Sequence, residues 1–174
     1  MAKKKRPAIR AHKHTQIESI EMFGARARLS PLGLIIYADH YLYAANTAQP
    51  SPDSGELHPA RLFLICRSLE LALKAFLSLR GRSLDELAGG AFGHDLDKLL
   101  AEADKQNLGA LVKLGDAQRF QIGRASIYYA EKVYEYPPVL EAMKAYPLRA
   151  SMDLLLDAAE TLIPPLREPC LHAE

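Results

Sequence analysis

Residues 59–80 read PARLFLICRSLELALKAFLSLR, and this stretch decides the fold class. Its apolar side chains recur every three or four residues, the spacing that places them on one face of an α-helix. Pro59 suits the first helical turn, and Arg80 followed by Gly81 is a typical helix end. The stretch therefore predicts one long helix whose core stripe is Leu62, Cys66, Leu69, Leu73 and Phe76.

Capping residues indicate where neighbouring helices begin. Ser30 followed by Pro31 combines an N-cap with proline at the first helical position, and it predicts a helix that runs to about Ala48. Ser83 and Glu86 have the spacing of a capping box, in which each side chain bonds the other residue's backbone amide. A short helical turn is therefore expected after Ser83.

Helical periodicity also dominates the second half of the chain. Helices are expected at about 95–106 and 115–136, and a last long helix from Pro147 to the pair Pro164-Pro165, which should end it. Sustained alternation of apolar and polar residues, the mark of a strand, is nearly absent. The sequence therefore predicts an all-α fold, an up-and-down bundle of four to five main helices.

Charge is distributed unevenly over the 174 residues, whose formal net charge is +1. The first thirteen residues hold six basic side chains and no acidic one, which leaves 16 basic against 21 acidic residues in the remainder. Such a segment can touch nucleic acid or an acidic membrane, but short lysine runs at termini are typically solvated. We therefore expect a basic, flexible leader at 1–28, a helical bundle domain at 29–166 and a C-terminal tail at 167–174.

The composition argues against several classes of protein. The leader lacks the apolar segment of a secretory signal, and no stretch approaches the ~18 uninterrupted apolar residues of a membrane span. Two cysteines, Cys66 and Cys170, do not make a disulfide framework, and the cysteines and histidines lack the spacing of a metal site. We expect a cytoplasmic protein without membrane contact, metal or cofactor.

The helix at 59–80 also carries charged residues on one side. Arg67, Glu70 and Lys74 follow one another at offsets of three and four, and the order of Glu70 and Lys74 favours a helical ion pair. The simplest interpretation is a solvated charged face. A functional site is the alternative.

A second group of polar residues begins the helix at 95–106. Asp95 is suited to cap that helix, and His94 before it could reach across the bundle to Glu70. The helix around Glu70 and Lys74 is too apolar to leave all these groups in solvent, and a buried charge needs a partner. We therefore predict that Glu70, Lys74, His94 and Asp95 lie close together.

The run RSLELALKAFL at residues 67–77, followed by GHDL at 93–96, resembles the HEPN-domain proteins. The likeness covers roughly residues 60–140, and its firmest part is the pattern SxExxxK…GHDL. The resemblance implies a bundle of four or five helices, often dimeric, from bacterial toxin–antitoxin, phage-defence or RNA-processing systems. Many members of the family are metal-independent endoribonucleases.

The catalytic motif of that family is incomplete in this chain. The ribonucleases carry an arginine, four to six other residues and a histidine on a late helix, whereas here Arg124 is followed by Tyr129 at the position of the base. A tyrosine with an ordinary pKa near 10 is a poor general base at neutral pH. Arg167 and His172 have the right spacing, but Pro169 lies between them in the tail, and we interpret that match as chance.

Two functional hypotheses follow from the resemblance, besides an unrelated helical scaffold. The first is a non-catalytic HEPN-like module that binds a partner protein, RNA or a nucleotide in a bacterial stress or defence system. Its candidate binding residues are Ser68, Glu70, Lys74, His94 and Asp95. The second is a toxin-like, metal-independent endoribonuclease with a degenerate active site, in which His94, or Arg124 with Tyr129, supplies the chemistry. Whether the chain is an enzyme stays open at this point.

The resemblance also implies a homodimer joined through the fourth helix, and an antitoxin is a further candidate partner. Tyrosines are dense in that region, and tyrosine is favoured at interfaces. We therefore expect the contact surface to include Tyr128 and Tyr129, with Tyr136 nearby.

Overall fold

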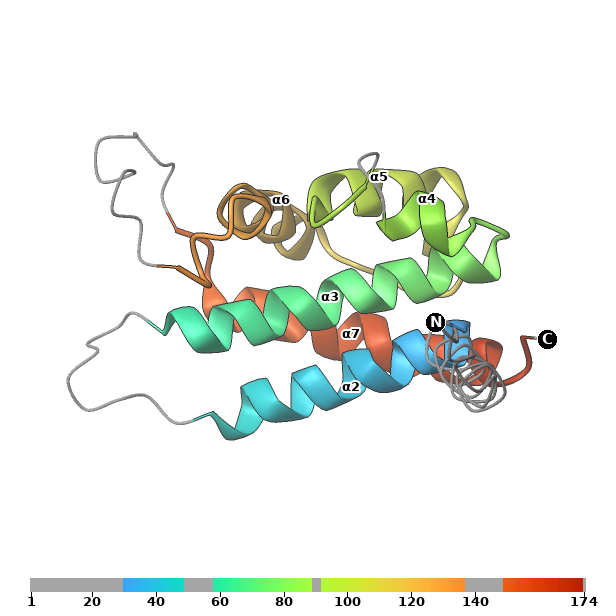
Figure 1. Cartoon of the computed structure of the whole chain (residues 1–174), viewed down its shortest axis with the longest axis horizontal. Helices are drawn as coiled ribbons and strands as arrows, with labels where there is room; N and C mark the ends of the chain where they lie inside the picture. The colour runs from blue at the N-terminus through green and yellow to red at the C-terminus, as the bar shows by residue number, and fades with distance from the viewer. Residues whose placement is uncertain (1–29, 49–57, 89–91, 137–148, 174) are drawn as a thin grey trace, which may run out of the picture.

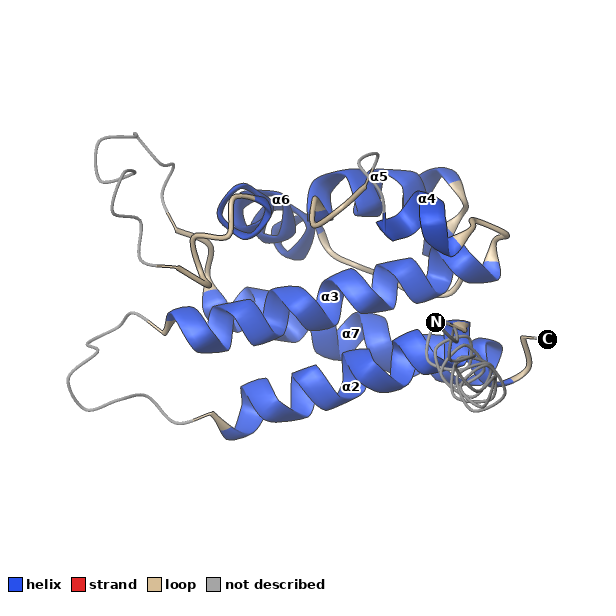
Figure 2. Cartoon of the chain, in the orientation of Figure 1, coloured by secondary structure: helices blue, strands red, loops and turns tan. Residues whose placement is uncertain are grey.

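The structure, a computed structural model, describes residues 30–48, 58–88, 92–136 and 149–173. All regular structure in these segments is helical (Figure 2). The order is α2 (Pro31–Thr47), α3 (Pro59–Leu79), the five-residue α4 (Leu84–Ala88), α5 (Leu96–Lys105), a 3-10 turn (Leu108–Ala110), α6 (Asp116–Ala130) and α7 (Met152–Leu171). The predicted all-α bundle is confirmed, with α2, α3, α5, α6 and α7 as its main helices.

Helix α3 is the centre of the bundle. Figure 1 shows it between a layer formed by α2 and α7 and a second layer formed by α5 and α6, and it packs against all four. Helices α2 and α7 run antiparallel, since Asn46 bonds Glu160 and Arg167 pairs with Asp39.

The predicted capping box before α4 is also present. None of the described helices has both the length and the apolar character that a membrane crossing requires.

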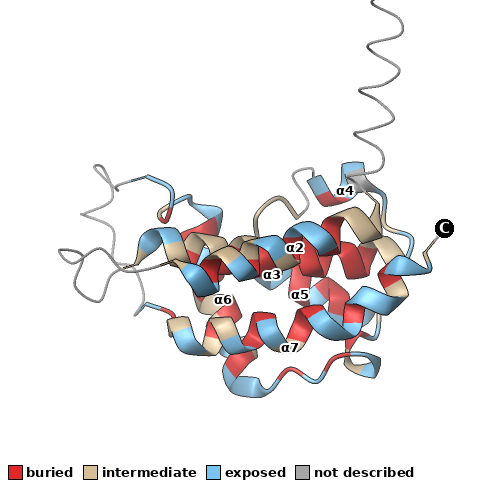
Figure 3. Cartoon of the chain, turned by 90° about the horizontal axis from the view of Figure 1, so that it is seen from below, coloured by how far each residue is buried: buried red, intermediate tan, exposed pale blue. Residues whose placement is uncertain are grey.

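The central position of α3 leaves its middle without a solvated side. All residues from Ser68 to Leu77 are buried, including Glu70 and Lys74. The outer helices instead turn exposed residues away from the bundle (Figure 3). The interpretation of Arg67, Glu70 and Lys74 as a solvated charged face is therefore wrong, because neighbours pack around α3 on both sides.

Helix α6 ends at Ala130, earlier than the predicted end near Tyr136. Lys132 adopts a left-handed conformation with φ 60°, and its amide bonds the carbonyl of Tyr129. The next amide, of Val133, bonds the carbonyl of Tyr128, which completes a Schellman helix end. The sequence did not reveal this end because lysine stands where glycine is usual.

Helix α7 continues to Leu171, past the proline pair predicted to end it. Pro164 and Pro165 are exposed, whereas Ile163 and Cys170 are buried, so packing of the inner face maintains the helix while solvent can satisfy the freed carbonyls. The predicted boundary between residues 166 and 167 therefore falls inside α7. Ser151 caps the start of α7, while Pro147 and the leader at 1–28 lie outside the described residues.

Candidate functional site

Glu70 is fully buried on α3 and accepts hydrogen bonds from four side chains. Lys74 Nζ donates to its Oε1 at 2.7 Å. The other carboxylate oxygen, Oε2, accepts from Arg67 Nη1 at 2.9 Å and from the Tyr129 hydroxyl at 2.6 Å. His94 Nδ1 lies 3.1 Å from the same oxygen. We call these five residues the Glu70 cluster.

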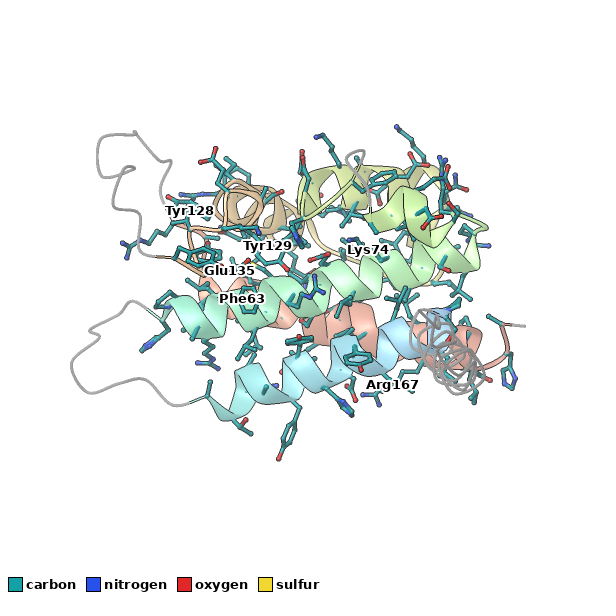
Figure 4. All side chains as sticks on the ribbon, in the orientation of Figure 1. Phe63, Lys74, Tyr128, Tyr129, Glu135 and Arg167 are labelled. Atoms are coloured by element: carbon teal, nitrogen blue, oxygen red, sulfur yellow. The ribbon has the colours of Figure 1, made fainter. Side chains whose placement is uncertain are left out.

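Three separate segments supply the Glu70 cluster. Arg67, Glu70 and Lys74 share one face of α3 because of their spacing. His94 comes from the turn before α5, and Lys74 Nζ donates to the carbonyl of Gly93 in that turn at 2.8 Å. Tyr129 reaches from α6 toward α3 (Figure 4). The cluster therefore ties the α5 turn and α6 to the central helix.

The charged groups of the cluster shift the pKa values of Glu70 and Tyr129. Burial alone would raise the pKa of Glu70, but the nearby charges of Lys74 and Arg67 outweigh it and hold that pKa below its usual range. Burial and the Glu70 carboxylate raise the pKa of Tyr129 far above its ordinary value, so its hydroxyl keeps its proton. Since an ionised carboxylate only accepts hydrogen bonds, the contact with His94 places a proton on Nδ1.

The predicted grouping of Glu70, Lys74 and His94 is thus confirmed, while Asp95 faces another side. Its Oδ1 caps α5 by accepting from the Lys98 amide at 3.1 Å and also accepts from the Ser126 hydroxyl of α6 at 3.0 Å. Asp95 therefore fastens α5 to α6.

The remaining candidate, Ser68, is fully buried and donates to the carbonyl of Ile65 at 2.8 Å. Its hydroxyl therefore makes a hydrogen bond within α3. Of the five predicted binding residues, Ser68, Glu70 and Lys74 are buried, so a ligand arriving from solvent would meet His94 or Asp95.

The sequence prediction missed two members of the cluster. Arg67 has the right offset from Glu70, but the candidate binding residues do not include it. Tyr129 is predicted as an interface residue or as a catalytic candidate beside Arg124, yet it is 1% exposed and its ring lies edge-on to His94 at 5.7 Å between centroids. A separation of 59 residues between Glu70 and Tyr129 leaves no local signal of their contact.

An open groove of about 600 Å³ lies between α5 and α6. Phe120 and Ile127 line it with exposures of 62% and 44%, and the Arg124 guanidinium stands over the Phe120 ring at 5.5 Å. Gly123 forms part of the wall, where an added Cβ would lie 3.2 Å from Asp97 Oδ1. The groove therefore combines exposed apolar surface with charges of both signs.

Other reactive groups are dispersed. In the segments that the structure covers, histidine, cysteine and acidic side chains form no group of three suited to a metal ion. Cys66 and Cys170 are buried free thiols, and burial raises the pKa of both. No family model, characterised protein or solved structure matches the chain.

Proposed function

We propose that this chain is a HEPN-like helical module that acts by binding a partner polypeptide, in a bacterial stress or defence setting, and that it is not a catalyst. The resemblance of residues 67–77 and 93–96 to that family supports the setting. One observation supports the non-catalytic part. Arg124 and Tyr129, the pair that stands in for the arginine and histidine of active relatives, face different environments: Arg124 lines the groove and Tyr129 is buried against Glu70.

The state of Tyr129 excludes it as a base. Its hydroxyl is already the donor to Glu70 and its pKa is raised, so it has no tendency to accept a proton from an RNA 2′-hydroxyl at neutral pH. Arg124 lines the groove instead, with its guanidinium over the exposed Phe120 ring. The two residues therefore cannot act on one scissile bond in this arrangement.

The groove between α5 and α6 is the surface best suited to a polypeptide. Exposed Phe120 and Ile127 flank Gly123, and arginine and acidic side chains surround them. Aromatic residues and arginine are enriched at protein interfaces, whereas RNA-binding surfaces are dominated by one positive field. A second copy of this chain is the occupant we favour, in a homodimer joined through α6.

The expected roles of Tyr128 and Tyr129 in such a dimer are wrong. Their exposures are 6% and 1%, because Tyr128 stacks on Tyr134 and Tyr129 bonds Glu70 within the same chain. Residues buried in the core cannot be contact residues without unfolding α6. Phe120 and Ile127 take their place as candidate anchors.

Sedimentation over a concentration range tests the dimer. The wild-type chain should associate at tens of micromolar, and the pair Phe120→Ala and Ile127→Ala should weaken association by about 2–4 kcal/mol if both are central anchors. The matched control is Ile36→Ala with Tyr43→Ala, which removes exposed apolar groups from α2 instead. A monomeric wild type, or equal effects of both double variants, would reject the α6 interface.

The endoribonuclease alternative rests on His94. Its Nδ1 faces the Glu70 carboxylate, and the side chain is 42% exposed, an arrangement that also orients histidine bases in hydrolytic enzymes. Purified protein should be incubated with total RNA, with and without a metal chelator, beside a His94→Gln variant. We expect intact RNA in every sample. Cleavage that persists in chelator and disappears in His94→Gln would replace the binding-only proposal with the nuclease.

A further inference from the structure

Helix α2 has an outward face without lysine, arginine or acidic side chains. Figure 1 shows α2 at the edge of the bundle, where its inner side packs on α3 and α7. Its outer side carries Ile36, Tyr37 and Tyr43, which are 44%, 42% and 71% exposed. His40 and Thr47 are also exposed and lie on the same side, because offsets of three and four bring residues together on a helix. We call these five residues the α2 face.

The α2 face differs from an ordinary solvated helix surface. The helix contains no lysine, arginine or glutamate, and its one acid, Asp39, pairs with Arg167 of α7. Single exposed apolar residues are common on proteins, but a continuous apolar stripe is typical of a surface that another element covers. A helix that is apolar on nearly all sides is likewise typical of a buried helix. The α2 face is therefore suited to pack against a further helix.

The sequence directly before α2 has the pattern of such a helix. Residues 15–29 read TQIESIEMFGARARL and lie outside the described part of the chain. Thr15 and Glu18 have the spacing of a capping box, which predicts that a helix begins after Thr15. The glycine at position 24 is a typical residue just past a helix end. The sequence therefore predicts a short helix at 16–23.

The apolar residues of this short helix would share one side. Ile17, Ile20 and Phe23 follow one another at offsets of three, whereas Glu18 lies on the opposite side and Glu21 at the border. A helix of this length is not stable by itself in water, so it needs a surface that buries its apolar side.

Chain length places this segment beside the α2 face. Residues 24–29 separate it from Ser30, the N-cap of α2, and a connection of that length typically joins antiparallel helices that pack together. Eight helical residues span about 12 Å, and the step from Ile36 to Tyr43 spans about 11 Å along α2. The segment therefore has the length that covers the face.

We propose that residues 16–23 dock as a helix on the α2 face of the same chain. Contact between the two apolar sides removes both from water, which favours docking. The short connection favours this segment over one from another chain, because tethering gives it a high effective concentration. The basic residues 1–13 show no such pattern and lie outside the contact. The α2 face is separate from the groove between α5 and α6, so this inference does not depend on the proposed dimer.

Tryptophan fluorescence of the full chain tests the contact, because the chain contains no tryptophan of its own. Phe23→Trp introduces a probe on the docking side, and Lys4→Trp introduces one in the basic stretch. Emission from Phe23→Trp should lie at shorter wavelength than emission from Lys4→Trp, because a buried indole is shielded from water. Equal emission wavelengths in the two folded variants would overturn the proposal.

Further substitutions identify the surface that covers the probe. Adding Ile36→Ser and Tyr43→Ser to Phe23→Trp should shift its emission to the wavelength of an exposed indole. The matched control adds Phe120→Ser and Ile127→Ser, which change exposed residues of the groove, and it should leave the emission unchanged. An unchanged emission after the α2 substitutions, or an equal shift in the control, would reject the α2 face.

Hydrogen exchange on the unmodified chain avoids any effect of the substitutions. The amides of residues 20–23, which would bond within the docked helix, should exchange at least about tenfold more slowly than those of residues 8–13 after correction for intrinsic rates. Equal corrected rates would contradict docking. Protection that falls on dilution would assign the segment to a second copy of the chain, and that result would also overturn the proposal.

Discussion

Helices α3 and α6 carry charged residues in similar helical spacing, but these residues differ in how deeply the bundle buries them. In α3, Glu70 is fully buried and is satisfied by four donors. On α6, Arg119 pairs with Asp104 of α5 at the surface, with exposures of 29% and 40%. The difference shows that the number of helices packed around a charge, more than the helical pattern, decides whether it is structural.

The largest expected effect is loss of the buried carboxylate. Glu70→Ala leaves Arg67, Lys74 and the Tyr129 hydroxyl without their shared acceptor, and the free energy of unfolding should fall by about 3–5 kcal/mol. The matched change at the surface, Asp104→Ala, should cost at most about 1 kcal/mol. Chemical denaturation measures both. Equal losses of free energy in the two variants would mean that the buried Glu70 carboxylate stabilises the fold no more than the exposed Arg119–Asp104 pair does.

The pH dependence of stability should distinguish the same two regions. The pKa of Glu70 is lower in the folded chain than in the unfolded chain, so its contribution is complete above the unfolded value near 4.3 and is lost as the pH falls further. Wild-type stability should therefore decrease below about pH 4.5, and Glu70→Gln should flatten that decrease.

Glu86→Gln provides the control for this measurement. The pKa of exposed Glu86 is also lowered, by hydrogen bonds from Ser83 at the start of α4, but without burial or a converging set of charges. Its removal should alter the acid limb of the stability profile less than removal of Glu70. A larger effect of Glu86→Gln would contradict the central role given to the cluster.

The smallest expected effect concerns the groove. Gly123→Ala removes a flexible residue from the middle of α6, which should raise the free energy of unfolding by up to about 1 kcal/mol. The new Cβ would come within 3.2 Å of Asp97 Oδ1, an exposed side chain that can move aside. Because Asp97 lines the groove, its displacement should also weaken association.

Denaturation and sedimentation together check the Gly123→Ala variant. Higher stability with weaker association would indicate that glycine serves the interface. A clear loss of stability would show instead that α5 and α6 need glycine to pack, and it would remove this argument for the groove.

Local features of the fold were predictable because they depend on residues close in the chain. Ser30 caps α2 and Asp95 caps α5, as their spacing indicated, and the long apolar run became α3. The two mistaken helix ends arose where nonlocal packing or an unusual residue intervened. Buried Ile163 and Cys170 maintain α7 beyond its prolines, and Lys132 takes the place of glycine after α6.

The candidate site was predictable only in part. Glu70, Lys74 and His94 could be grouped from an apolar helix that needed a partner for its charge. The hydroxyl of Tyr129 and the groove between α5 and α6 could not, because both depend on how α6 crosses the bundle. The same dependence explains why Tyr128 and Tyr129 were expected at an interface and lie in the core.

The sequence by itself determined the helices, because helical periodicity and capping are set by neighbours within one turn. It also placed Arg67, Glu70 and Lys74 on one face of α3. Only the tertiary structure decided that this face is enclosed, that Glu70 is shared by two cations, and that Arg67 and His94 form the more exposed edge of the cluster. Burial depends on which helices surround a residue, and segments far apart in the chain supply them.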